Sequence, residues 1–107
     1  MNNLPIVDAE ISIEPIGTSD TSIGKEIAAA YDAIRGIQNL KRVTLTPMST
    51  QIESYNLDDI FHAIRVAHNS AKSAGVKRII STIRIDERFD KPNTLEEKVQ
   101  SVKAKVS

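Results

Sequence analysis

Residues 76–98, VKRIISTIRIDERFDKPNTLEEK, predict a strand, a charged corner and a capped helix in direct succession. Along residues 79–85, one face carries Ile79, Ile83 and Ile85 and the other carries Ile80, Thr82 and Arg84. This alternation of a mostly apolar and a mostly polar face predicts a half-buried strand with a stiff β-branched backbone. Five charges then fall within residues 86–91. Thr94 and Glu97 have the spacing of a capping box, which predicts that a helix begins there.

The rest of the chain predicts three more strands and two more helices. Alternating residues indicate strands at 6–13, 42–46 and 50–53, and apolar stripes indicate helices at 23–37, capped by Thr21 or Ser22, and at 57–74, between Asn56 and Gly75. The order strand, helix, strand, strand, helix, strand predicts an α+β, ferredoxin-like βαββαβ sandwich with an additional C-terminal helix. We expect one domain over residues 1–107.

Composition excludes several classes of function. The 14 basic and 14 acidic residues cancel, so we expect no nucleic-acid partner. The absence of cysteine rules out disulfides, thiol catalysis and thiolate metal sites. No apolar run approaches the roughly 20 residues of a membrane span, and the N-terminus lacks a basic start followed by an apolar block. The expectation is a cytoplasmic protein without a membrane partner.

In the predicted fold both main helices cover one face of the sheet and leave the other face open. Alternation places ten mostly polar side chains on that open face: Asp8, Glu10, Ser12, Glu14, Gln51, Glu53, Arg78, Ile80, Thr82 and Arg84. Such a polar, acid-rich face can bind a cation or a second copy of the sheet. Alternatively, Glu10 and Glu53 pair with Arg78 and Arg84, which stabilises by less than about 1 kcal/mol per exposed pair and implies no function.

No constellation of residues predicts catalysis or a metal site. His62 and His68 are six residues apart, which puts them on different faces of one helix. Asp86, Glu87 and Asp90 alternate with basic residues and lack the pattern of a calcium loop, so salt bridges within the corner or between subunits are favoured. No serine lies in a nucleophile elbow. We expect a protein that is not an enzyme and requires no cofactor.

Several strings taken together resemble the small thiamine-binding proteins. They are SIEPIGT at 12–18, PMSTQIE at 47–53, His68, the segment from Arg78 to Lys91, and EKV at 97–99. The resemblance spans nearly the whole chain and implies a ferredoxin-like fold, a homotetramer and thiamine as the ligand. The chain departs from the family at Ser49, where relatives usually have glycine. Glycine would let a ligand approach the backbone closely, whereas here a serine side chain occupies that space.

Thiamine combines a cationic thiazolium, an aminopyrimidine and a hydroxyethyl tail, so its site needs carboxylates, hydroxyls and an apolar wall. The expected ligand-binding residues are Glu10, Ser12, Met48, Thr50, Glu53, Thr82 and Arg84. Thr50 and Glu53 lie on opposite faces of an ideal strand and converge only if the hairpin is bulged or short. Arg84 is expected to orient a carboxylate.

Two functions follow from these expectations. The first is a non-catalytic cytoplasmic binding protein for thiamine or a related aminopyrimidine. The second is a ligand-sensing or structural ferredoxin-like oligomer with a small-molecule site at the subunit seam. In both, we expect a homo-oligomer, a tetramer rather than a dimer, because the fold leaves two sheet edges, one face and the apolar stripe of the last helix uncovered.

Overall fold

The computed structural model describes residues 5–106 and contains one four-stranded antiparallel sheet with three helices. The elements in chain order are β1 (Val7–Pro15), α1 (Gly24–Arg35), β2 (Arg42–Leu45), β3 (Thr50–Ser54), α2 (Leu57–Ser73), β4 (Ile79–Glu87) and α3 (Leu95–Lys103). The strand order is β2-β3-β1-β4. This confirms the predicted ferredoxin-like α+β fold, with the first and third strands in the centre of the sheet.

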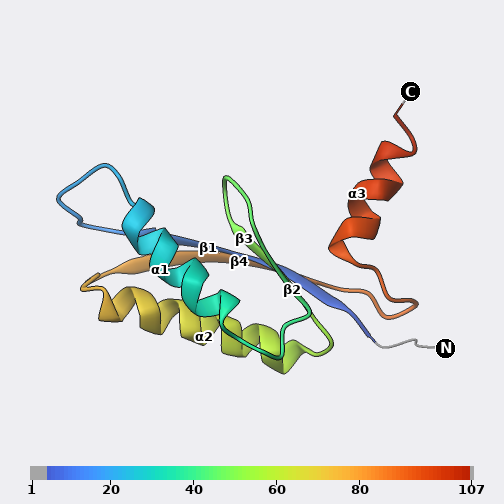
Figure 1. Ribbon diagram of the computed structural model, residues 1–107, viewed down its shortest axis with the longest axis horizontal. Helices are drawn as coiled ribbons and strands as arrows, with labels where there is room; N and C mark the ends of the chain where they lie inside the picture. The colour runs from blue at the N-terminus through green and yellow to red at the C-terminus, as the bar shows by residue number, and fades with distance from the viewer. Residues whose placement is uncertain (1–4, 107) are drawn as a thin grey trace.

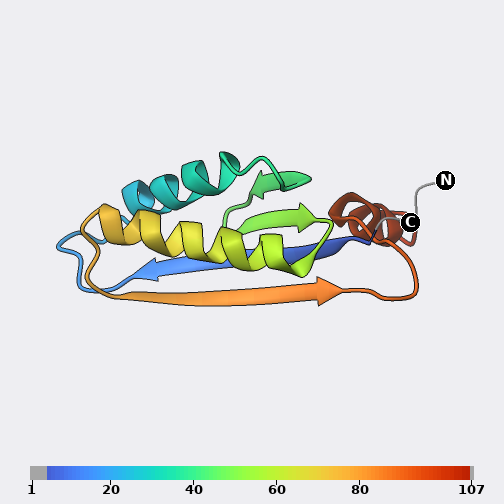
Figure 2. The same cartoon turned by 90° about the horizontal axis from the view of Figure 1, so that it is seen from below.

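The two longer helices lie side by side on one face of the sheet, whereas α3 stands at the end of the sheet, beyond the loop that follows β4 (Figures 1 and 2). The core fills the space between the sheet and α1 and α2. Its buried residues are Val7, Ala9, Ile11, Ile13, Ala30, Ile34, Ile52, Ile60, Ala63 and Ala67. The opposite face of the sheet is covered only at one end, where the start of α3 lies over Glu53 and Asp8, so the rest of it is available to a ligand or another chain.

Local sequence signals set the ends of most elements as predicted. The Asn56 side chain accepts a hydrogen bond from the Asp59 amide at 2.8 Å and caps α2. Beyond the end of α2, Gly75 has φ +92°, a conformation that favours glycine. Thr94 and Glu97 form the complete capping box of α3. Each signal acts over a few residues, which explains why the sequence alone could identify it.

The prediction for the ends of α1 was wrong. Neither Thr21 nor Ser22 caps this helix, since both lie before the N-cap position in a loop where the Ser22 amide donates to the Asp20 side chain at 3.2 Å. Ile23 occupies the N-cap without a side-chain cap. Ile37 lies beyond the end of α1, although it still packs against the core.

The third helix contributes nothing to the core. None of its residues is buried, and Val99, Val102 and Val106, along its predicted apolar stripe, are 52%, 62% and 70% exposed. Within residues 5–106, no helix combines the length and apolar character that crossing a membrane would require.

Candidate ligand-binding site

The open face of the sheet is built from rows of side chains that face one another across neighbouring strands. Strand pairing places Asp8 between Glu53 and Asp86 in one row. The next row along the strands has Glu10 at its centre, between Gln51 and Arg84. These rows confirm the acid-rich open face predicted from alternation.

Glu10 is held by contacts to two elements. The Ser49 hydroxyl donates to Glu10 Oε2 at 3.1 Å, and Arg84 Nη1 lies 3.5 Å from Glu10 Oε1. Ser12 and Thr82 pair with each other in the adjacent row, two residues further along the same strands. The structure therefore brings together four predicted site residues, namely Glu10, Ser12, Thr82 and Arg84. The Glu10 side chain remains 31% exposed, so its carboxylate is accessible.

A recess of about 590 Å³ opens on this face, within the range of roughly 300–1,000 Å³ that is typical of small-molecule sites. Its lining residues are Asp8, Ala9, Glu10, Gln51, Arg84, Ile85, Asp86, Glu87, Leu95 and Lys98. Four of them are acidic and two are basic, so the lining favours a cation. The predicted site residues Glu10 and Arg84 belong to this recess.

Glu53, also predicted as a ligand contact, lies on the open face but is completely buried beneath the start of α3. The Leu95 amide donates to Glu53 Oε1, and Lys41 Nζ lies 3.1 Å from Oε2. Both carboxylate oxygens are thus used to attach α3 and the residue before β2. This geometry gives Glu53 an anchoring role.

Asp8 is the most deeply buried of the recess residues that sequence reasoning did not select as ligand contacts. It is 3% exposed, and its Oδ2 lies 2.8 Å from Lys98 Nζ. Its Oδ1 is buried and has no hydrogen-bond partner among the described residues. Alternation placed Asp8 on the open face, but its burial depends on α3, whose position no local signal indicates.

Burial raises the pKa of Asp8, and the nearby charges of Glu53 and Asp86 act in the same direction. The hydrogen bond and charge of Lys98 oppose this shift without cancelling it. For Lys98, burial acts to lower the pKa, but hydrogen bonds to Asp8 and Asp86 outweigh it and raise the pKa. The Lys98 ammonium therefore pairs with both the Asp8 and the Asp86 carboxylates at this end of the recess.

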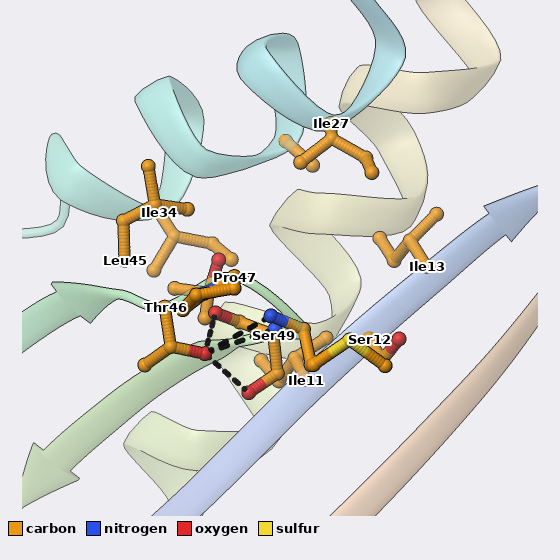
Figure 3. Close-up of a pocket in the computed structure, with 12 residues that line it drawn as sticks. Ile11, Ser12, Ile13, Ile27, Ile34, Leu45, Thr46, Pro47 and Ser49 are labelled. Atoms are coloured by element: carbon orange, nitrogen blue, oxygen red, sulfur yellow. Dashed lines mark hydrogen bonds between the residues drawn. The ribbon is translucent and has the colours of Figure 1, made fainter. Parts of the chain in front are cut away.

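The remaining predicted residues, Met48 and Thr50, line a second, smaller pocket beneath the β2–β3 hairpin. Ser12 also lines this pocket (Figure 3). Thr50 is buried on the helix-covered side, while Met48 is 83% exposed near the hairpin tip. The pairing of β3 runs without a bulge from Thr50 to Ser54, so the condition for Thr50 to converge with Glu53 is not met. The structure separates these two residues from the recess.

This second pocket has a volume of about 60 Å³, room for a few water molecules only. Figure 3 shows the isoleucines of β1 and α1 around it and the hydrogen bonds that close the hairpin turn. The Thr46 hydroxyl donates to the Ser49 carbonyl at 2.9 Å and accepts from the Ser49 amide at 3.1 Å. Because Ser49 also donates to Glu10, this turn connects the pocket to the recess.

His68, Arg88 and Asp90 bond to other side chains of the chain itself, as structural residues do. His68 Nε2 lies 2.8 Å from the Ser81 hydroxyl, and His62 is exposed. Arg88 and Asp90 form an ion pair within the corner, at 2.6 Å. Nowhere in residues 5–106 do three or more His, Cys, Asp or Glu side chains gather as metal ligands would.

Comparison with known sequences identifies similar proteins over almost the whole chain. A family model described as thiamine-binding protein matches residues 9–103. A UPF0045 protein of Methanothermobacter thermautotrophicus is 35% identical over 101 residues, which cover 94% of this chain and 100% of the relative. The UPF0045 protein YqgV of Bacillus subtilis is 38% identical over 96 residues, covering 88% of this chain and 91% of the relative.

Solved structures show the same fold. A hypothetical protein of Methanocaldococcus jannaschii superposes with a TM-score of 0.81 at 35% identity, covering 92% of this chain and 96% of that protein. A Thermotoga maritima protein, described as a candidate for thiamine biosynthesis or salvage, superposes with a TM-score of 0.77. It is 21% identical and covers 92% of this chain and 99% of its own, a likeness that concerns the fold alone.

Proposed function

Because this chain belongs to the family of thiamine-binding proteins, we propose that it is a non-catalytic cytoplasmic protein that binds thiamine or a related aminopyrimidine in the recess on the open face. The observation that carries this proposal is the partly exposed Glu10 carboxylate, which Ser49 and Arg84 hold in an acid-lined recess of suitable size. Binding requires no chemical change and no cofactor.

The chemistry of the recess matches the parts of thiamine. The carboxylate of Glu10 can accept a hydrogen bond from the exocyclic amine of the pyrimidine. The hydroxyls of Ser12 and Thr82, in the row next to the recess, can donate to or accept from its other polar atoms. Leu95, a half-buried lining residue at the start of α3, provides apolar surface for the rings. The excess of carboxylates in the lining favours the permanent positive charge of the thiazolium.

Replacement of Glu10 by glutamine is expected to weaken thiamine binding about tenfold, because an ionised acceptor contributes roughly 1–2 kcal/mol more than a neutral one. Isothermal titration calorimetry measures the affinity. Glu14→Gln is the matched control, since Glu14 lies on the same strand and face but outside the recess. Equal affinity of the wild type and Glu10→Gln would remove Glu10 from the site.

We further propose that the protein is a homo-oligomer, a tetramer rather than a dimer, because much apolar surface lies uncovered in the single chain. β2 and β4 are sheet edges, and Ile80 on the open face is 46% exposed. Val99 and Val102 on α3, and Val106 just beyond its end, face solvent. This surface also supports the alternative function, a sensing or structural oligomer with a small-molecule site at its seam. Native mass spectrometry separates the two: a thiamine-sized mass on the purified protein supports the first, and a bare oligomer supports the second.

Size-exclusion chromatography with light scattering is expected to show no stable monomer at micromolar concentration. Val102→Glu should shift the protein towards smaller species, because it places a charge within the apolar stripe of α3. Lys103→Glu changes the charge of the neighbouring residue on α3 and serves as the control. A clean monomer of the wild type contradicts the proposed assembly.

A further inference from the structure

We propose that Asp8 and Asp86 form a subsite for the positive charge of a heterocyclic organic cation, and that Lys98 occupies this subsite in the unliganded protein. The inference rests on the proposed function, since it assigns the charge-binding end of the same recess. It makes Lys98 a competitor built into the chain. A ligand cation would enter by displacing the lysine ammonium from the two carboxylates.

The position of the lysine ammonium carries this proposal. Lys98 Nζ lies 2.8 Å from Asp8 Oδ2 and 2.5 Å from Asp86 Oδ2. The two aspartates face each other across β1 and β4, and all three side chains line the recess. The structure thus shows where a positive charge is held on this face, and which group holds it there.

Asp8 and Asp86 together have more negative charge and more acceptor oxygens than the single Lys98 ammonium can pair with. Glu53, in the same row, is already paired with Lys41. Asp8 and Asp86 therefore share a single positive charge, and the buried Oδ1 of Asp8 has no partner among the described residues. An unpaired buried carboxylate oxygen is costly, which is consistent with the raised pKa of Asp8. A larger cation with hydrogen-bonding groups could contact more of these oxygens.

Displacement of Lys98 does not require α3 to unfold. The start of the helix is fixed independently, by the capping box of Thr94 and Glu97 and by the hydrogen bond from the Leu95 amide to Glu53. The lysine side chain has a flexible stem of four carbons, so its ammonium can move to solvent while the backbone stays in place. A delocalised heterocyclic cation is also more weakly hydrated than an ammonium, so its desolvation costs less free energy when it enters a partly buried site.

The test compares three ligands on the intact protein by titration calorimetry: thiamine, a trimethylthiazolium salt that lacks the pyrimidine, and the corresponding uncharged aminopyrimidine alcohol. A competitor that fills a subsite for about nine-tenths of the time weakens the apparent affinity about tenfold. Lys98→Met should therefore bind thiamine and thiazolium about tenfold more tightly, with no change for the uncharged pyrimidine. Asp86→Asn should weaken binding of both cations.

The matched control is Lys103→Met, which removes the same charge from an exposed position of α3 and should leave all three affinities unchanged. Lys98→Gln keeps a hydrogen-bond donor in place and should give an intermediate gain. Circular dichroism verifies that each variant retains its helices. Equal or weaker thiamine binding by Lys98→Met overturns the subsite while leaving the proposed function standing.

The thiazolium salt distinguishes the two failures. If neither thiamine nor the aminopyrimidine alcohol binds, but the thiazolium binds in an Asp86-dependent way and more tightly to Lys98→Met, the cation subsite stands and the proposed function fails. If neither cation binds to the wild type or to Lys98→Met, the subsite is overturned, and the proposed function falls with it unless the aminopyrimidine alcohol binds.

Discussion

Replacement of Glu53 by alanine is expected to lower the free energy of unfolding by about 3 kcal/mol, because it removes one partner of a buried ion pair and leaves a backbone donor without its acceptor. The Glu53 carboxylate is completely buried and joins Lys41 to the Leu95 amide. Urea denaturation followed by circular dichroism measures the loss. Hydrogen exchange should show α3 as the element that is released first.

Two variants bracket this effect. Glu53→Gln keeps an acceptor for the Leu95 amide but loses the charge that pairs with Lys41, so its cost should be smaller. Gln51→Ala changes the next residue on the same face of β3, which is only half-buried, and should cost less than about 1 kcal/mol. A Glu53→Ala protein as stable as Gln51→Ala would show that the buried carboxylate does not anchor α3.

Replacement of Ile52 by alanine is expected to be more damaging, at about 4 kcal/mol, because the lost apolar contacts leave a cavity that the surrounding core fills only partly. Ile52 is the neighbour of Glu53 on β3, but it points to the opposite face and is fully buried between Ala9 and Val43 on the adjacent strands. The same denaturation experiment measures this loss.

The two substitutions should differ in pattern as well as in size. Ile52→Ala is expected to increase hydrogen exchange throughout the sheet and both core helices, whereas Glu53→Ala acts chiefly on α3. Ile80→Ala is the control, since Ile80 is half-exposed on the edge strand β4. A cost for Ile52→Ala no greater than that for Ile80→Ala would contradict the position of the core.

Much of the fold could be predicted because its determinants are local. The alternation of β1 separates Val7 from Asp8 and assigns each side chain to a face, whatever the rest of the chain does. Asn56 and Gly75 delimit α2 through interactions that span only a few residues. The same reasoning placed Glu10 on the open face beside Arg84, where the structure has them.

The parts of the site that sequence reasoning missed depend on contacts between distant segments. Glu53 looked like a free carboxylate because its partner, the Leu95 amide, is a backbone group 42 residues away. Asp8 looked like an ordinary polar residue of a solvated face because nothing local indicates that α3 covers it. The hydrogen bond from Ser49 to Glu10 likewise spans 39 residues.

The strand order has a consequence for synthesis of the chain. β1 is the first element, yet it lies inside the sheet, and both of its neighbours, β3 and β4, come later. On the ribosome, one edge of β1 must therefore wait for β3, about halfway along the chain, and the other edge for β4, at residues 79–87. Pairing between such distant segments folds slowly and leaves intermediates that are prone to aggregate.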